Sequence, residues 1–237
     1  MKHVKLFEQF INEKHEDYDG WANSTDKEII AVIKRNGIIS YKGMLSTGFE
    51  PSDAVKAGCL KIDPQILQHI ENPSEELQLI AVSQDSFKKF NMTRHWREDF
   101  ENAIRWIPNP SEKVQMAAVS QDGTAIKFIK NPSEKIQMAA VEEDNGALEF
   151  IVNPSEKVQI ASVKQSHPIK ASVSIKFISD PSEKVQIASV EAYSGSIKYI
   201  QNPTPKVQMI ACKDYAPNIE YIKVPAPEVA KEFSSLK

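Results

Sequence analysis

The sequence has little or nothing of several features that mark common classes of protein. Its 237 residues include two cysteines, Cys59 and Cys212, too few for a disulfide framework, so we expect two buried thiols in a reducing compartment. No apolar run approaches the roughly 20 residues that a membrane helix needs. The N-terminus lacks the apolar stretch of a secretory signal. We therefore expect a cytoplasmic protein without membrane contact.

Charge of one sign and catalytic motifs are also missing. The formal net charge of −3 gives no overall attraction to nucleic acid or to an anionic membrane surface. The five histidines are scattered without metal-ligand spacing, and the sequence has no glycine-rich phosphate loop and no nucleophile elbow. The sequence therefore predicts no catalytic residue, no metal and no cofactor, and a protein that is not an enzyme.

One motif is repeated many times. "NPSEKVQMAAV" at 109–119 returns as "NPSEKIQMAAV" at 131–141, "NPSEKVQIASV" at 153–163 and "DPSEKVQIASV" at 180–190. The unit is 22 residues, lengthened twice, and a blurred copy at Asn23 precedes the clear ones. A repeat of this length is typical of stacked helical units. The clear copies start at Glu50, Asn72, Asn109, Asn131, Asn153, Asp180 and Asn202.

Each unit contains start and stop signals for two helices. We expect Asn109 to cap the first helix, with Pro110 at its first position and Glu112 reaching back to the cap. This helix should end near Gln121, where Gly123 supplies a left-handed stop. A second short helix, "TAIKFIK", should follow and end at the next Asn-Pro. The apolar arc of the first helix is wide, which predicts packing on two sides.

A column of aromatic positions runs through the second helices. Aliphatic residues two before and one after each ring predict that the ring fills the gap between adjacent helix pairs. The alternative is a row of base-stacking platforms for single-stranded nucleic acid. The positions are His69, Trp106, Phe128, Phe150, Phe177, Tyr199 and Tyr221.

Two polar columns follow the first helices. The glutamines are predicted to bond to backbone as a structural ladder, the alternative being a side-chain code for RNA. The lysines are predicted to form a solvated, self-screened face, the alternative being a track for phosphates. These columns are Gln78, Gln115, Gln137, Gln159, Gln186 and Gln208, and Lys113, Lys135, Lys157, Lys184 and Lys206.

The repeats resemble the leucine-rich-variant repeats and related HEAT-like repeats, in which an Asn-Pro or Asp-Pro turn precedes a helix with "EVxxAVA"-like text. The resemblance covers residues 50–223. It implies an all-α fold, a right-handed α-solenoid of about eight 22-residue two-helix repeats with a concave surface for a partner. The chain lacks the cysteine cluster that some such proteins use for an iron–sulfur site, so we expect no metal.

The longest departure from the regular repeat is the insertion at about 86–102, "SFKKFNMTRHWREDFEN". Its aromatic and basic side chains suit an interface anchor, and equally an amphipathic helix that covers one edge of the stack. A second insertion at 166–172 is predicted to be a wider turn. The candidate partner-binding residues are Phe87, Lys88, Lys89, Arg94, His95, Trp96 and Arg97.

The N-terminal segment differs from the repeat domain, which we place at 23–237. Residues 1–22 are predicted to be an amphipathic peptide and a linker. The peptide resembles the capsid-targeting peptides of T-even-type phage internal head proteins, and the alternative is a helix that caps the first repeat. In that resemblance Glu13 is the expected cleavage position. The matching residues are Phe7, Phe10, Ile11 and Glu13.

The sequence therefore predicts a non-enzymatic scaffold that binds a protein partner. The N-terminal resemblance suggests a phage protein that is packaged in the virion head or acts on a host protein. The alternative is a nucleic-acid-binding helical-repeat protein. Neither the partner nor the oligomeric state follows from the sequence.

Overall fold

The computed structural model describes residues 21–36, 38–84, 102–164 and 174–233. Within these ranges every regular element is an α-helix (α) or a 3₁₀ helix (η), and no strand occurs, which confirms the all-α prediction. The elements in chain order are α2 (Asp26–Asn36), α3 (Ile38–Ser46), α4 (Asp53–Leu60), η1 (Pro64–His69), α5 (Glu75–Val82), η3 (Ala103–Trp106), α7 (Glu112–Gln121), η4 (Gly123–Phe128), α8 (Glu134–Glu143), η5 (Asn145–Phe150), α9 (Glu156–Val163), η6 (Ile175–Phe177), α11 (Glu183–Ala192), η7 (Ser194–Tyr199), α12 (Pro205–Asp214), η8 (Ala216–Tyr221) and α13 (Pro227–Phe233).

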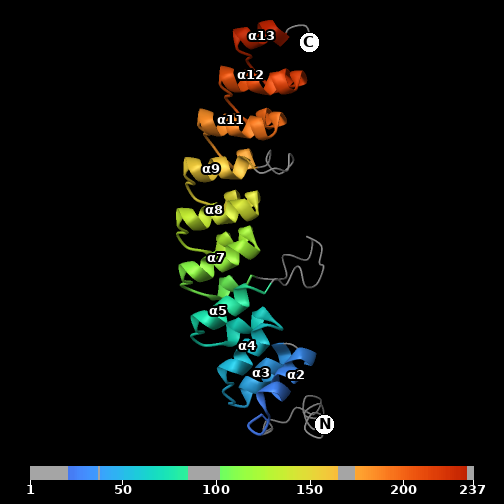
Figure 1. Ribbon diagram of the computed structural model, residues 1–237, viewed down its shortest axis with the longest axis vertical. Helices are drawn as coiled ribbons and strands as arrows, with labels where there is room; N and C mark the ends of the chain where they lie inside the picture. The colour runs from blue at the N-terminus through green and yellow to red at the C-terminus, as the bar shows by residue number, and fades with distance from the viewer. Residues whose placement is uncertain (1–20, 37, 85–101, 165–173, 234–237) are drawn as a thin grey trace. The chain divides into compact units, whose positions relative to one another are not determined.

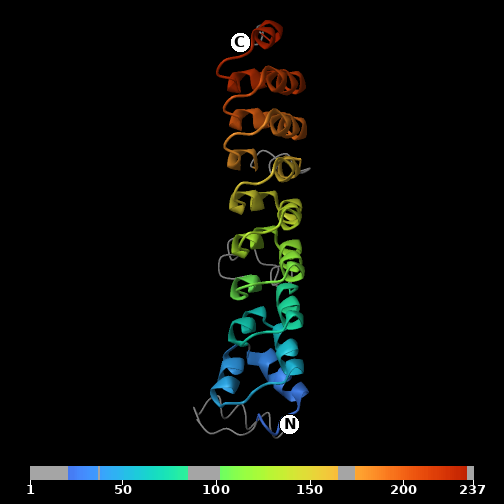
Figure 2. The same cartoon turned by 90° about the vertical axis from the view of Figure 1, so that its left-hand side faces the viewer.

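The chain divides into two compact units, residues 1–117 and 118–237. In the second unit the α-helices contact one another in chain order: α8 with α9, α9 with α11, α11 with α12, and α12 with α13 (Figure 1). The 3₁₀ helices form a parallel layer, in which η4 contacts η5 and η7 contacts both η6 and η8 (Figure 2). Regular helix and 3₁₀ pairs in sequential contact are consistent with a repeat array.

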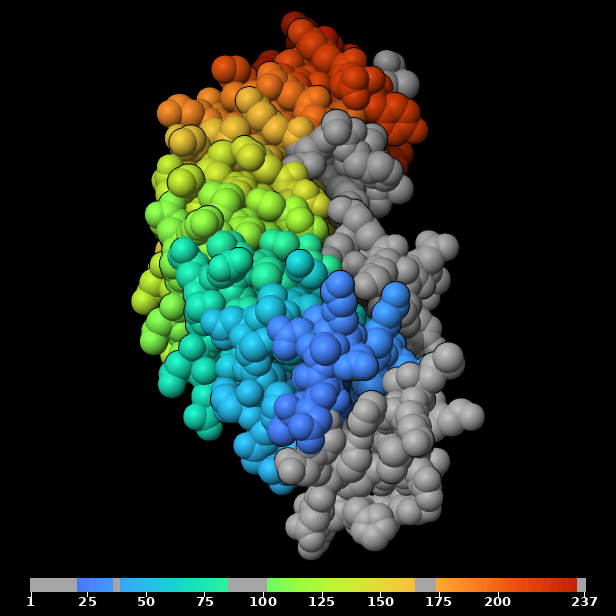
Figure 3. All heavy atoms as spheres, turned by 60° about the horizontal axis from the view of Figure 1, so that its bottom comes forward, coloured from blue at the N-terminus to red at the C-terminus, as the bar shows by residue number. Residues whose placement is uncertain are grey.

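The first unit begins with a less regular pair of helices. Helix α2 contacts α3 and α4, and α4 contacts α5 and η1. Figure 3 shows the residues of these first helices, in blue and cyan, as adjoining parts of one surface. Tyr41 and Met44 of α3 are fully buried. The second helix of this first repeat is thus an α-helix, whereas the later repeats have a 3₁₀ helix at that place.

The core of each repeat is built from the same three positions of its α-helix. In α8 these are Ile136, Ala140 and Val141, all fully buried. The small middle residue allows neighbouring helices to approach closely. Cys59 occupies the middle position in α4. Cys59 and Cys212 are both buried free thiols, which confirms their predicted burial. Burial raises the pKa of the Cys59 thiol to about 12.

The prediction for the start of each α-helix was wrong by two residues, because serine and not asparagine is the N-cap. The Ser111 hydroxyl accepts a hydrogen bond from the Val114 backbone N–H, 3.3 Å away, and the helix begins at Glu112. Asn131 and Asn153 instead have φ of 51°, in the left-handed region that asparagine tolerates. The asparagine therefore turns the chain, and the serine after the proline caps the helix.

The predicted glycine stop was also wrong. Gly123 begins η4, and among the described glycines the positive φ belongs to Gly48. The chain leaves α7 through the extended residue Asp122, whose side chain accepts a hydrogen bond from the Thr124 backbone N–H, 3.0 Å away. Gly123 is needed for space, because a Cβ there would lie 2.3 Å from the Ala140 carbonyl oxygen.

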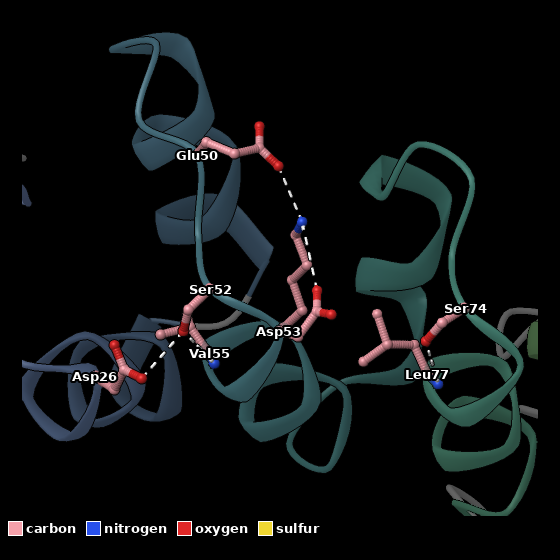
Figure 4. Close-up of polar contacts among 8 residues, drawn as sticks. Asp26, Glu50, Ser52, Asp53, Val55, Ser74 and Leu77 are labelled. Carbon is pink, nitrogen blue, oxygen red and sulfur yellow. Dashed lines mark hydrogen bonds and ion pairs between the residues drawn. The ribbon is translucent and has the colours of Figure 1, made fainter.

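The N-cap serine also links its repeat to the preceding one. The Ser52 hydroxyl donates to the Asp26 carboxylate at 3.0 Å, as Figure 4 shows beside the Ser52 cap. The Ser182 hydroxyl donates in the same way to Glu156, at 2.6 Å. This hydrogen bond, and after it the one from Lys184, lowers the pKa of Glu156. The repeated "PSEK" text thus encodes a helix cap and a contact between repeats.

The lysine column forms ion pairs between repeats at the surface. Lys157 Nζ lies 3.6 Å from Glu134, and Lys184 Nζ lies 3.3 Å from Glu156. Both lysine side chains are more than two thirds exposed, at 71% and 77%. For these two positions the prediction of a solvated, self-screened face is confirmed.

The glutamine column is structural, as predicted. In all six repeats the amide nitrogen donates to the carbonyl of the proline five residues earlier, at 2.8–3.0 Å. The amide oxygens of Gln186 and Gln208 accept hydrogen bonds from the backbone N–H groups of Thr204 and Ala226 in the following repeat. Each glutamine therefore satisfies backbone groups at the helix entry that would otherwise lack a partner.

Replacing Ser155 with alanine should lower the free energy of unfolding by about 1 kcal/mol, because the Val158 N–H loses its capping oxygen. Urea unfolding followed by circular dichroism measures the change. Ser155→Thr is the matched control, since Thr204 already caps α12 with the same hydroxyl geometry. An equal loss in Ser155→Thr would contradict the assignment of the serine as N-cap.

Replacing both Ser189 and Ser196 with alanine should stabilise the protein, by about 1 kcal/mol for each residue. Both hydroxyls are buried without a hydrogen-bond partner among the described residues. Alanine is native at the equivalent positions Ala140 and Ala147. Ser162→Ala is the control, because its hydroxyl donates to the Gln159 carbonyl at 2.8 Å, so this change should not stabilise. Denaturant midpoints decide the outcome, and a double variant that is less stable would refute the expectation.

Candidate functional site

The candidate site residues named from the sequence lie outside the described residues. Glu13 falls within 1–20, and the partner-binding candidates fall within 85–101. The insertion at 166–172 also lies outside. These assignments stay predictions. The partner-binding candidates concerned are Phe87, Lys88, Lys89, Arg94, His95, Trp96 and Arg97.

The aromatic column lies at the surface in much of the second unit, so its assignment to the core was wrong there. Phe150 is 40% exposed, while Leu148 before it and Ile151 after it are buried. The reason is the helix type. A 3₁₀ helix has three residues per turn, so the two aliphatic residues, three apart, share one side and the ring points away from it. Phe177 and Tyr221 are exposed in the same way.

A second set of aromatic residues replaces a capping residue. Asp63, Asp122 and Asp144 precede their 3₁₀ helices, and each side chain accepts a hydrogen bond from the backbone N–H two residues later. At the equivalent positions before η7 and η8 stand Tyr193 and Tyr215, whose side chains make no capping bond. Both tyrosines are exposed. The repeats of η7 and η8 therefore have an exposed aromatic ring at the position where the earlier repeats have a capping aspartate.

Three tyrosines and two lysines gather on η6, η7 and η8 in what we call the Tyr–Lys cluster. The ring of Tyr199 is central: its centroid lies 4.1 Å from Lys176 Nζ and 4.8 Å from Lys198 Nζ. At these distances both ammonium groups make cation–π contacts with the ring. The members are Lys176, Tyr193, Lys198, Tyr199 and Tyr221.

Hydrogen bonds and charges within the cluster shift two pKa values. The pKa of Lys198 is raised, first by its hydrogen bond with Tyr199 and further by the nearby Tyr193 and Tyr221 hydroxyls. The pKa of Tyr199 is lowered, first by its hydrogen bond with Lys198 and also by Lys176. Lys198 thus interacts with tyrosines of two successive 3₁₀ helices.

The position of Tyr193 depends on Gly195. A Cβ at Gly195 would lie 2.6–2.8 Å from three atoms of the Tyr193 ring and hydroxyl group, so the tyrosine lies across the start of η7. Glycine at this place therefore leaves room for a surface ring. Sequence reasoning missed the cluster, although a comparison between repeats gives the signal, because tyrosine replaces the capping aspartate in two of them.

Neither lysine of the cluster has a carboxylate partner within the described residues. They differ in this from Lys157 and Lys184, which pair with glutamates. The cluster thus offers two ammonium groups and exposed rings to a binding partner.

The described part of the chain has no group of three or more potential metal ligands. None of its helices has the length and apolarity needed to span a bilayer. Comparisons with protein-family models, with curated proteins and with solved structures found no match to this chain. The functional argument therefore depends on the exposed side chains themselves.

Proposed function

We propose that the chain is a non-enzymatic scaffold that binds a protein partner, built as a right-handed α-solenoid of about eight 22-residue two-helix repeats. The regular helix and 3₁₀ pairs in sequential contact support the solenoid. Solenoids of this kind present extended surfaces to partners. A role as a phage protein, packaged in the virion head or directed at a host protein, rests on the N-terminal resemblance alone.

The observation that carries the binding proposal is the loss of the cap at Tyr193 and Tyr215. An aspartate there satisfies a backbone N–H, and a cap of this kind contributes about 1 kcal/mol. The tyrosines give up that contribution and expose large rings. Tyrosine is enriched among the residues that dominate protein interfaces. We attribute these exposed side chains to contact with a partner.

Nucleic acid is the second candidate, because Lys127 Nζ lies 4.9 Å from the Phe128 ring and 5.9 Å from the Phe150 ring. Bases stack on exposed rings while lysines neutralise phosphates. Glu149 and Glu220 weaken this candidate, since they occupy the lysine position in two repeats. A phosphate backbone that followed the column of rings would pass both carboxylates and be repelled by them.

The test is capture of proteins from the cells that encode the chain, followed by titration of each purified captured protein with the full-length chain. A stoichiometric complex whose affinity changes little between about 50 and 200 mM salt supports the proposal. Binding of an oligothymidylate alone, with a steep loss over the same salt range, overturns it in favour of nucleic acid. A variant that lacks residues 86–102 tests the predicted insertion site.

A further inference from the structure

The Tyr–Lys cluster differs from the ring positions of η4 and η5, which have one lysine and one glutamate before two phenylalanines, in ring type and in charge. Earlier repeats present phenylalanine at the ring position, as Phe128 and Phe150, whereas η7 and η8 present Tyr199 and Tyr221. Tyrosine adds a hydrogen-bonding hydroxyl to the ring, which suits a contact that is partly apolar and partly polar. The cluster therefore fits a ligand that has both kinds of group.

The two lysines give the cluster a positive charge. Lys176 and Lys198 both lie against the Tyr199 ring, and neither forms an ion pair with a carboxylate of the described residues. Two ammonium groups held beside one ring create a local positive potential in a chain whose net charge is −3. The complementary ligand is an anion with a surface that can stack on tyrosine.

The residues that precede the ring in each 3₁₀ helix limit the length of the anionic part of the ligand. The residue before the ring is a glutamate in the repeats on either side: Glu149 in η5 and Glu220 in η8. A carboxylate of the ligand beside either glutamate would be repelled. The favourable region therefore spans the two repeats of Lys176 and Lys198. This suits a short acidic stretch of polypeptide and disfavours a continuous polyanion.

We propose that the Tyr–Lys cluster binds a short acidic segment of a protein partner, in which one or two carboxylates flank an aromatic or aliphatic side chain. This inference rests on the proposed function, because it names the partner chemistry of the scaffold. The carboxylates contact Lys176 and Lys198, and the apolar side chain packs between the rings of Tyr193 and Tyr221. Electrostatic complementarity of this type selects the partner and speeds its association.

A displayed library of random peptides, each about 12 residues long, tests the inference by selection on the full-length chain. The enriched peptides should contain Asp or Glu next to an aromatic or aliphatic residue. Fluorescence polarisation should then show that the double variant Lys176→Glu, Lys198→Glu binds a selected peptide at least about tenfold more weakly. Lys127→Glu is the matched control, since Lys127 lies against rings in the same unit, and it should change the affinity less than about twofold.

Gly195→Ala is a second variant that tests the ring. The three atoms nearest to its Cβ all belong to the side chain of Tyr193, so the protein should stay folded while the tyrosine moves, and the peptide should bind about threefold or more weakly. Circular dichroism confirms the fold of each variant.

Four results would overturn the inference, and the first two come from the peptide experiments. One is a selection without acidic enrichment, and the other is equal weakening in the double variant and in Lys127→Glu. Tighter binding of an oligothymidylate than of any selected peptide would assign the surface to nucleic acid. A captured partner protein that binds the wild type and the double variant equally would refute the cluster while the proposed function stands. A chain that binds no protein at all would refute the proposed function.

Discussion

Replacing Ile136 with alanine is expected to lower the free energy of unfolding by about 3 kcal/mol. Ile136 of α8 is fully buried, and α8 contacts α9, η4 and η5. The substitution removes three carbons from water-free surroundings and leaves a cavity that the packed neighbours fill only partly. Urea unfolding of the full-length chain, followed by circular dichroism, measures the loss.

Ile136→Val is the control for this prediction. Valine occupies the equivalent place in the neighbouring helices, at Val114 and Val158, so the repeat accepts it, and the loss should be about 1 kcal/mol. If alanine cost no more than valine, the position would not be part of a close-packed core.

The second large effect is expected for Gln208→Met, which should lower the free energy of unfolding by about 2–4 kcal/mol. Methionine keeps the volume of the side chain, so the loss reports hydrogen bonds. The Gln208 amide donates to the Pro203 carbonyl at 2.9 Å and accepts from the Ala226 N–H at 2.8 Å. Both backbone groups lose their partner in a place that is largely buried, and each such group costs about 1–3 kcal/mol.

Gln137→Met is the matched control. Among the described residues, the Gln137 side-chain amide makes one hydrogen bond, which it donates to the Pro132 carbonyl. Its expected loss is about 1 kcal/mol. Chemical denaturation of both variants under identical conditions gives the comparison. Equal losses would show that the bond from Ala226 adds nothing to the contact between repeats.

Much of the fold follows from the sequence because the repeats are nearly identical. The period predicts the order of the helices, and the wide apolar arc of the first helix in each repeat predicts its packing on two sides. The glutamine column was interpreted correctly for a physical reason: an amide inside an apolar arc needs hydrogen-bond partners, and the nearest are backbone groups.

The errors have physical causes of a local kind. In "NPSE" both Asn and Ser are good capping residues, and only the backbone dihedral angles decide between them. The extended conformation of Ser155 after proline and the positive φ of Asn153 settle it. The aromatic residues were predicted to be buried because aliphatic residues flank them, whereas in a helix with three residues per turn the flanking residues share one side and Phe150 points outward.

The Tyr–Lys cluster was missed because the sequence was searched for insertions. The sequence drew attention to residues 86–102 because their length breaks the repeat. Most of the Tyr–Lys cluster lies in repeats of regular length, where composition alone gives the signal, as at Tyr193. A position-by-position comparison of the repeats against the physical role of each position would have found it.

The hydrogen bond from an N-cap serine to a carboxylate of the preceding repeat bears on how the chain tolerates connections of different length. Ser111 donates to Glu75 at 2.5 Å, although the two are 36 residues apart, and Ser182 donates to Glu156 across 26 residues. The docking register of one helix on the next is thus independent of the length of the connection. Two successive helices can therefore keep the same hydrogen bond, and the same alignment, when the connection between them differs in length.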